Sequence, residues 1–178
     1  MGGHQARELQ VVTLGFKLDP VYIPAKRSDV FRTLLYEPEI YVKIHPLCTG
    51  VSNIVRSQDK DGRRIVDFDI QERLVLLGFY ETSNSTFHVT TKALEENVAT
   101  QLTAKPLRGM VKINQGFDFS DAKKGNEDGT MLGDHAEYTA PRILARFVLR
   151  EAVAAHTAIT QNIRQHFMEV SQQAMDDI

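Results

Sequence analysis

The most regular pattern of apolar and polar positions lies at the C-terminal end of the chain, from Pro141 to about Ser171. Good helix formers dominate this run, no Gly or Pro follows Pro141, and Thr139 is suited to be the N-cap, so the run predicts one long helix. At about 100° per residue, one face of this helix is apolar. That face consists of Leu144, Val148, Ala152, Ala155, Ile159, Ile163 and Val170, and the opposite face carries Arg146, Arg150, Thr157, Gln161 and Arg164. A long helix with a single apolar face needs a broad surface to lie on, which predicts a sheet upstream.

The chain before this helix begins with a strand and two short helices. Residues 12–18 alternate between apolar and polar side chains, which is the pattern of a half-buried strand. Ser28 is suited to cap a short helix over residues 29–36, and Pro38 opens a second one. The second helix ends at His45, because a residue before proline is pushed out of the α region. We therefore expect the sheet to begin, to be interrupted by two short helices after strand one, and then to resume.

The sheet resumes as a series of short alternating segments. These predict strands over residues 51–57, 65–74, 86–91, 98–104, 111–119 and 130–139, with turns at 60–63, 76–80 and 95–97 and a polar, mobile loop over 121–129. About seven strands that are segregated from the helices indicate an α+β fold, in which a curved antiparallel sheet surrounds the long C-terminal helix. No repeat or linker divides the chain, so we expect a single domain over residues 1–178, with flexible ends at 1–8 and 172–178.

Composition and charge exclude several classes of function. A hydrophobic content of 42% is enough to bury a core in a chain of 178 residues. A net charge of −2 gives no electrostatic reason to expect nucleic acid or an anionic membrane as a partner. Cys48 is the only cysteine, so no intramolecular disulfide can form and a reducing compartment fits best. No apolar run is long enough to cross a bilayer, and the first ten residues do not form a signal peptide. We expect a cytoplasmic protein.

The order of these elements and several short motifs resemble the START-related helix-grip superfamily. The motifs are Ile23-Pro24-Ala25 before Asp29-Val30-Phe31, Glu37-Pro38-Glu39 leading to His45-Pro46, Gly129-Thr130 opening the last strand, and Tyr138-Thr139-Ala140-Pro141 opening the last helix. The resemblance covers residues 9 to 167. The superfamily, also called SRPBCC, includes lipid-transfer domains, pollen-allergen-like carriers, ubiquinone-binding proteins and polyketide cyclase/dehydratases. The resemblance implies a helix-grip fold with a mostly apolar cavity between the sheet and the long helix, which is the general character of a small-molecule site.

A few polar residues occur in the inward phase of the predicted strands and helix. Glu72 shares its phase with Val66, Phe68 and Ile70, and Gln115 shares that of Ile113 and Phe117. Asp134 and Tyr138 share the phase of Leu132 and Ala136. His156 lies about 40° from the centre of the apolar helix face. Such groups are costly to bury unless they are paired, so they are candidates to orient the polar group of an apolar ligand. The predicted ligand-binding residues are Glu72, Gln115, Asp134, Tyr138, His156, Phe68, Phe117 and Ile159. The alternative is that strand phase slips at a bulge, that these groups lie in water at strand ends, or that His156 is a hydrogen-bonded core residue.

Other candidate chemistry is weaker. His45 and Tyr41 share a helix face near the expected cavity mouth, where they either contact a ligand or belong to a solvated loop. The histidines show no metal-ligand spacing and Cys48 has no cysteine partner, so we expect no metal site. No phosphate-binding glycine loop and no serine nucleophile elbow is present, so we expect no cofactor, and no catalytic residue is assigned.

Two functions remain open from the sequence. The first is binding or transport of a hydrophobic small molecule, such as a lipid, an isoprenoid or a polyketide-like compound. The second is a cyclase or dehydratase that acts on such a ligand, with Glu72, Asp134, Tyr138 or His156 transferring protons. Two titratable inward groups that reach one point favour the enzyme, and a single isolated polar group favours the carrier. The stripe of Arg142, Arg146 and Arg150 is either a solvated face or a docking site for an acidic partner, and Phe147 and Met168 beside it allow a monomer or a weak homodimer.

Overall fold

A computed structural model describes residues 10–76, 80–94, 97–104 and 112–176, and the side chains of 10–73, 86–94, 112–174 and 176. The strands are β1 (Val11–Lys17), β2 (Val21–Ile23), β3 (Cys48–Gln58), β4 (Arg64–Leu76), β5 (Tyr80–Ala93), β6 (Asn97–Ala104), β7 (Lys112–Lys124) and β8 (Glu127–Pro141). The helices are α1 (Arg27–Tyr36), the 3₁₀ turn η1 (Pro38–Ile40), α2 (Tyr41–Ile44) and α3 (Arg142–Asp176). The predicted turns at 76–80 and 95–97 and the predicted flexible end at 1–8 fall mainly or wholly outside the described residues.

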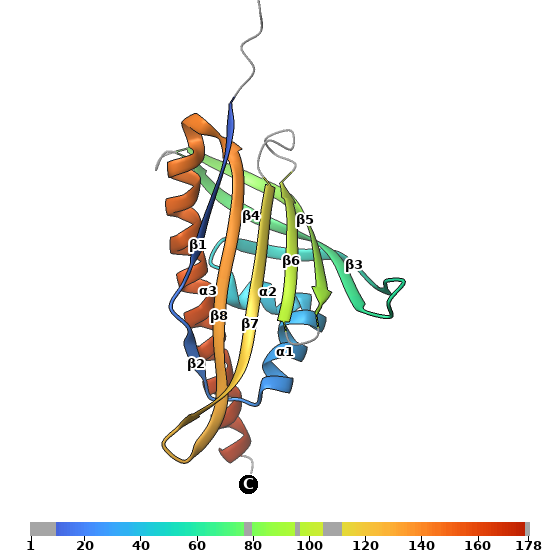
Figure 1. Ribbon diagram of the computed structural model, residues 1–178, viewed down its shortest axis with the longest axis vertical. Coiled ribbons are helices and arrows are strands. Elements are labelled where there is room, and N and C mark those ends of the chain that lie inside the picture. Colours follow the sequence, from blue (N-terminus) through green and yellow to red (C-terminus); the bar gives the residue numbers. More distant parts are fainter. Residues whose placement is uncertain (1–9, 77–79, 95–96, 105–111, 177–178) are drawn as a thin grey trace, which may run out of the picture.

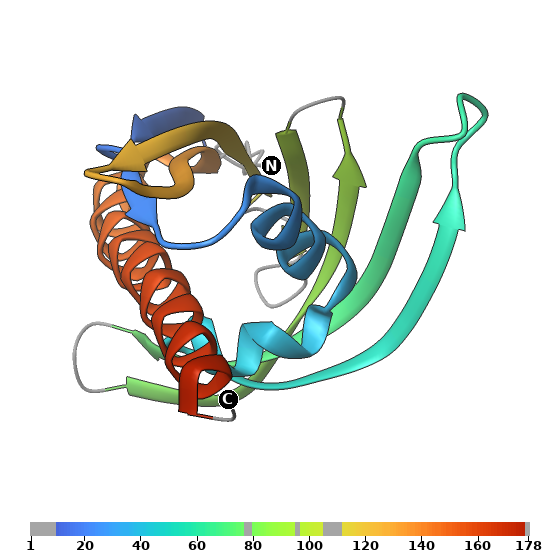
Figure 2. The same cartoon turned by 90° about the horizontal axis from the view of Figure 1, so that it is seen from below.

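The strands form one antiparallel sheet in the order β1-β8-β7-β6-β5-β4-β3, and β2 pairs with the far end of β8. The first strand therefore lies beside the last, and the chain crosses to the opposite edge through the short helices. The sheet curves strongly, and α3 runs along its concave side against β8, β1 and β2 (Figures 1 and 2). The helices α1 and α2 lie inside the curve, and α2 packs against α3 (Figure 2). This arrangement confirms the predicted α+β helix-grip fold with two short helices ahead of the main run of strands.

The sheet differs from the prediction in two places. It has eight strands, because Val21–Ile23 pairs with residues 130–132 of β8 instead of ending the first segment. Residues 121–129 form a regular hairpin and not a loop, since β7 and β8 pair from Lys124 and Glu127 onward. Gly125 has a φ of 65° at the turn, a conformation that glycine adopts without steric cost. The hairpin projects beyond the core, and most of its residues are exposed on both faces, so no apolar alternation reveals it (Figure 1).

The helix ends also differ from the prediction. The N-cap of α1 is Lys26, without a side-chain hydrogen bond, and Ser28 lies inside the first turn. Thr139 belongs to β8, where its Oγ1 lies 3.0 Å from Thr13 Oγ1 across the β1–β8 pair, so it does not cap α3. The helix α3 continues to Asp176, five residues past the predicted end.

The prediction of the apolar face of α3 is wrong for one residue. Val170 is 48% exposed, and Phe167, one turn earlier, is the last buried residue among the α3 side chains that the structure describes. Ala152, Ile159 and Ile163 are buried as predicted. The described residues of α3 after Phe167 are exposed, although Ser171 Oγ still donates to the carbonyl of Pro24 at 3.5 Å.

The core lies between the concave face of the sheet, α3 and the short helices. Its largest fully buried side chains come from every layer and include Phe68, Phe117, Ile23, Leu34, Leu35, Ile44, Ile70, Leu132, Ile159 and Ile163. The inward phases predicted for β4, β7 and β8 are therefore correct. Among the described residues, no helix is long and apolar enough to span a membrane.

Candidate functional site

A hydrogen-bonded chain of three buried side chains joins β8 to α3. Asp134 and Tyr138 are four residues apart on one face of β8, because side chains that are an even number of residues apart share a face of a strand. His156 of α3 lies between them. The Tyr138 hydroxyl lies 2.8 Å from His156 Nε2, and His156 Nδ1 lies 2.8 Å from Asp134 Oδ2. The three residues are between 1% and 5% exposed, so water does not compete for these bonds.

The hydrogen-bond partners indicate which atoms of these three side chains carry the protons. A carboxylate can only accept, so whenever the His156 ring is neutral, its proton lies on Nδ1 and is donated to Asp134. The Nε2 atom then accepts from the Tyr138 hydroxyl, whose oxygen keeps lone pairs for a further donor. Burial first, and then the negative charges of Asp134 and Glu72, raise the pKa of Tyr138 well above its ordinary value. Tyr138 therefore keeps its proton at neutral pH and is not present as a phenolate.

The side chain of Phe16 fixes the orientation of this imidazole. Phe16 of β1 pairs with Ala136 of β8, between Asp134 and Tyr138. Its ring meets the His156 ring edge to face, with centroids 5.0 Å apart, and stacks on Tyr138 at 5.9 Å. Such aromatic contacts restrict the rotation of the rings in addition to burying apolar area.

A second buried pair lies between α2 and β4. His45 Nε2 lies 3.3 Å from Glu72 Oε1, and the two side chains are 13% and 8% exposed. The backbone N–H of Leu47 donates to His45 Nδ1 at 3.3 Å, so the neutral ring carries its proton on Nε2 and directs it at Glu72. Burial raises the pKa of Glu72 to about 7. Burial and, secondly, the charge of His156 lower the pKa of His45 to about 4. At neutral pH, His45 is uncharged and Glu72 can gain or lose a proton.

Local irregularities of the sheet hold this second pair in place. The β3–β4 register shifts between Cys48 and Gly50, and the β4–β5 register shifts directly after Glu72. Bulges of this kind re-aim side chains and are frequent beside functional sites. The Asn162 side chain of α3 donates to the carbonyl of Ile44 at 2.9 Å, and this bond fixes the end of α2 just before His45. The predicted alternative of a bulge therefore holds for the β4–β5 pair, but the register shifts only after Glu72, which stays buried.

Two buried polar atoms close to the Tyr138–His156–Asp134 chain lack a partner. Gln115 is 8% exposed and Asp134 is 1% exposed. Gln115 Nε2 and Asp134 Oδ1 have no hydrogen-bond partner among the residues that the structure describes. An unpaired buried polar group typically costs about 1–3 kcal/mol, so both atoms are suited to meet a ligand or a trapped water.

The two hydrogen-bonded groups lie within electrostatic reach of each other. The charge of Glu72 raises the pKa of Tyr138, and the charge of His156 lowers the pKa of His45. One group is held by α2 and β4, and the other by β8 and α3. Together they place proton donors and acceptors at two positions in a mainly apolar interior.

All eight residues predicted to bind a ligand are buried in this interior. Phe68, Phe117 and Ile159 are at most 2% exposed and belong to the main core cluster. Contact of any of the eight with a ligand stays a prediction. The solvated-loop alternative for His45 is wrong, because Glu72 and the end of α2 hold it inside.

Sequence reasoning missed the contacts of two residues. It placed His45 near the expected cavity mouth but did not predict its pairing with Glu72. Phe16 shares the inward phase of Val12 and Leu14, which predicts burial but not a contact with His156.

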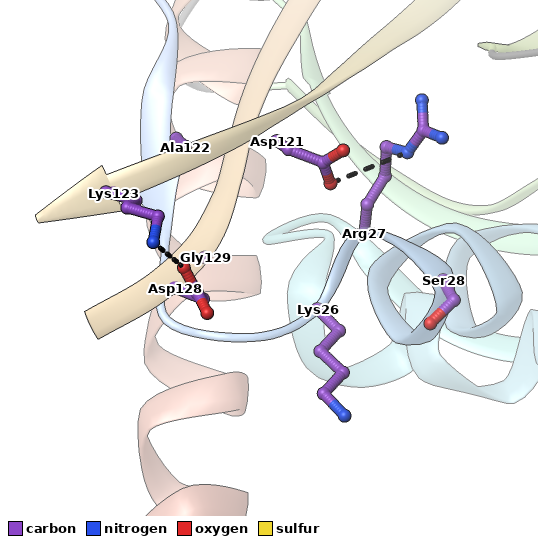
Figure 3. A pocket seen from close by; sticks show the side chains of 8 residues that line it. All are labelled: Lys26, Arg27, Ser28, Asp121, Ala122, Lys123, Asp128 and Gly129. Carbon is purple, nitrogen blue, oxygen red and sulfur yellow. Dashed lines mark ion pairs between the residues drawn. The ribbon is translucent and has the colours of Figure 1, made fainter. Parts of the chain in front are cut away.

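A surface groove of about 600 Å³ separates the start of α1 from the β7–β8 hairpin (Figure 3). Arg27 and Asp121 form an ion pair across it at 3.7 Å, Lys123 pairs with Asp128 at 3.1 Å, and Lys26 extends away from both. Because four of these five charges form two solvent-exposed ion pairs, we do not assign the site here. No group of three potential metal ligands occurs among the described residues.

The fold has clear relatives among solved structures. A START superfamily protein from Mycobacterium smegmatis superposes with a TM-score of 0.62 and 14% identity over 90% of this chain and 98% of that one. Ara h 8.0201 superposes with a TM-score of 0.57 and 12% identity over 90% and 99% of the two chains. Norcoclaurine synthase from Thalictrum flavum superposes with a TM-score of 0.56 and 12% identity over 95% and 96%. No model of a known family and no curated protein matches the sequence. At these identities the likeness establishes the helix-grip fold and not a shared activity.

Proposed function

We propose that this protein binds a mainly apolar small molecule between the sheet and α3, with the polar group of the ligand at the buried polar side chains. The observation that carries the proposal is the set of titratable and amide groups on an inner face that is otherwise apolar. Packing alone does not require these groups, since apolar residues of similar volume are usually at least as stabilising. A site that orients a ligand does require a few convergent polar groups in apolar surroundings.

The ligand classes that fit are lipids, isoprenoids and polyketide-like compounds. A large apolar part would contact Phe68, Phe117 and Ile159, and an oxygen-bearing part would meet the polar groups. This choice is supported by the helix-grip fold that the chain shares with a START superfamily protein and with norcoclaurine synthase, since the resemblance to the START-related superfamily implies an apolar cavity.

Native mass spectrometry of gently purified protein tests the proposal. We expect bound apolar mass, or uptake of at least one compound from a panel of fatty acids, isoprenoid alcohols and alkylphenols. Phe117→Trp should weaken uptake, because the larger ring fills the interior, whereas Lys112→Trp on the exposed start of β7 should not change it. A protein that takes up no compound of the panel would contradict the proposal.

A second candidate function is proton-transfer catalysis of the cyclase or dehydratase type. The observation that favours it is the presence of two hydrogen-bonded titratable groups in the interior instead of one isolated polar group. Glu72, with a pKa of about 7, would remove or return a proton, and the Tyr138 oxygen would accept a hydrogen bond from the hydroxyl group of the ligand.

Dehydration of an apolar β-hydroxyketone to a conjugated enone, followed by ultraviolet absorbance, tests the second candidate. We expect Glu72→Gln to lower turnover by about 10²–10⁴-fold and to leave ligand binding nearly unchanged. If the wild type binds the ketone but does not accelerate loss of water, this candidate fails and the binding proposal stands.

A further inference from the structure

The unpaired atoms of Gln115 and Asp134 belong to neighbouring positions on one face of two paired strands. Gln115 of β7 pairs with Ala136 of β8, and Asp134 pairs with Phe117. Gln115 and Asp134 are therefore diagonal neighbours, with Cα atoms about 7–8 Å apart, a separation that long side chains bridge. His156 Nδ1 engages Oδ2 of Asp134 and leaves Oδ1 as the remaining acceptor.

The two atoms have opposite hydrogen-bonding character. Gln115 Nε2 is a donor and needs an acceptor, whereas Asp134 Oδ1 is an acceptor and needs a donor. Both side chains are more than nine-tenths buried, so bulk water does not satisfy them. A single oxygen that carries a hydrogen satisfies both, because it accepts from the amide and donates to the carboxylate.

We propose that Gln115 and Asp134 together bind a hydroxyl group of the ligand, so that the ligand is an apolar alcohol or phenol. This inference rests on the proposed binding function and specifies its substrate class. A carboxylate ligand would face the charge of Asp134, a ketone or ether would leave Asp134 without a donor, and an ammonium group would leave Gln115 without an acceptor. The competing occupant is a trapped water molecule, which offers the same donor and acceptor.

A cycle of two ligands and two proteins tests the inference. The probes are 4-octylphenol and octylbenzene, which differ only in the hydroxyl group, and the readout is direct binding by isothermal titration calorimetry. In Gln115→Leu, we expect the ratio of the two dissociation constants to shift by about tenfold against the phenol, because one hydrogen bond is lost. The matched control is Asn114→Leu, which removes an exposed amide from the opposite face of the same strand and should leave the ratio unchanged.

The outcomes separate this inference from the proposed function. If the wild type binds neither probe nor any other apolar compound, the binding function itself fails. If it binds both probes but Gln115→Leu leaves their ratio unchanged, the hydroxyl site is wrong and a water fills the position.

A comparison in the wild type covers the case in which Gln115→Leu does not fold. The methyl ether of 4-octylphenol can accept from Gln115 but cannot donate to Asp134, so it should bind about tenfold or more weakly than the phenol. Equal binding of the ether and the phenol would also overturn the inference.

Discussion

His45 Nε2 lies 3.3 Å from Glu72 Oε1, and burial reverses the order of their two pKa values. The pKa of His45 falls from 6.5 to about 4, while that of Glu72 rises from 4.5 to about 7. Folding therefore releases a proton from His45 and takes up a proton at Glu72 over nearly the same range of pH. The two contributions to the pH dependence of stability oppose each other.

The first prediction is that each single variant reveals the contribution of the other residue. In Glu72→Gln only His45 of the pair can titrate, and its pKa is lower in the folded than in the unfolded state. The stability that His45 contributes is therefore fully present above pH 6.5 and is lost as pH falls toward 4. In His45→Gln only Glu72 of the pair can titrate, and its pKa is higher in the folded than in the unfolded state. The stability that Glu72 contributes is therefore fully present below pH 4.5 and is lost as pH rises toward 7.

Urea unfolding between pH 4 and 7.5 measures these slopes. Each variant should change by about 1 kcal/mol per pH unit within its window, in opposite directions, and the wild type should change much less between pH 4.5 and 6.5. The control is His135→Gln, which removes a half-exposed imidazole on the outer face. Slopes of the same sign in the two variants would show that the buried pair does not titrate in this way.

The second prediction concerns the hydroxyl of Tyr138. Tyr138→Phe leaves His156 Nε2 buried without its donor, so we expect a loss of about 1–3 kcal/mol in the free energy of unfolding. The matched control is Tyr22→Phe, because the Tyr22 hydroxyl donates to the carbonyl of Glu127 at 3.2 Å in an exposed position. That variant should lose less than about 0.5 kcal/mol. Similar losses in the two variants would mean that water reaches His156.

The third prediction concerns the approach of β2 to β8. A Cβ atom at Gly129 would lie 2.6 Å from the carbonyl oxygen of Ile23, and the backbone would have to move. We expect Gly129→Ala to cost about 1–3 kcal/mol of stability, as overpacking does. At Gly133 the nearest atom is Asp118 Cβ at 3.4 Å, an ordinary contact, so Gly133→Ala should stay within about 0.5 kcal/mol. Thermal and urea unfolding of the pair measure the difference, and equal costs would show that β2 does not pair closely with β8.

The sequence predicts which side chains point inward better than it predicts which of them meet. Glu72, Gln115 and Tyr138 follow from strict alternation along single strands, because the side-chain period of a strand is two. Their contacts depend on how separate elements are placed. His156 reaches both Asp134 and Tyr138 because of the position of α3 along β8 and its rotation about its own axis. No local sequence pattern specifies that position or that rotation.

Features with little apolar contrast were predicted least well. The hairpin over 121–129 is polar on both faces, so only Gly125 indicates its turn. His45 is polar and lies at a helix end, where sequence patterns usually indicate solvent. Its burial results from tertiary contacts with Glu72 and from the bond between Asn162 and the end of α2.

The last prediction tests the packing of α3 on the sheet. Ile159 is 2% exposed and belongs to the main core cluster, so Ile159→Ala removes packing that the curved sheet cannot easily recover. We expect a loss of about 2–5 kcal/mol in the free energy of unfolding. Arg150 lies on the opposite face, where it pairs with Glu151 in water, so Arg150→Ala should change the stability by less than about 0.5 kcal/mol. A loss near 1 kcal/mol at Ile159 with altered ligand uptake would show that the residue borders an open cavity, since atoms would then already be missing on one side. Equal, small losses in both variants would contradict the placement of α3 on the concave face.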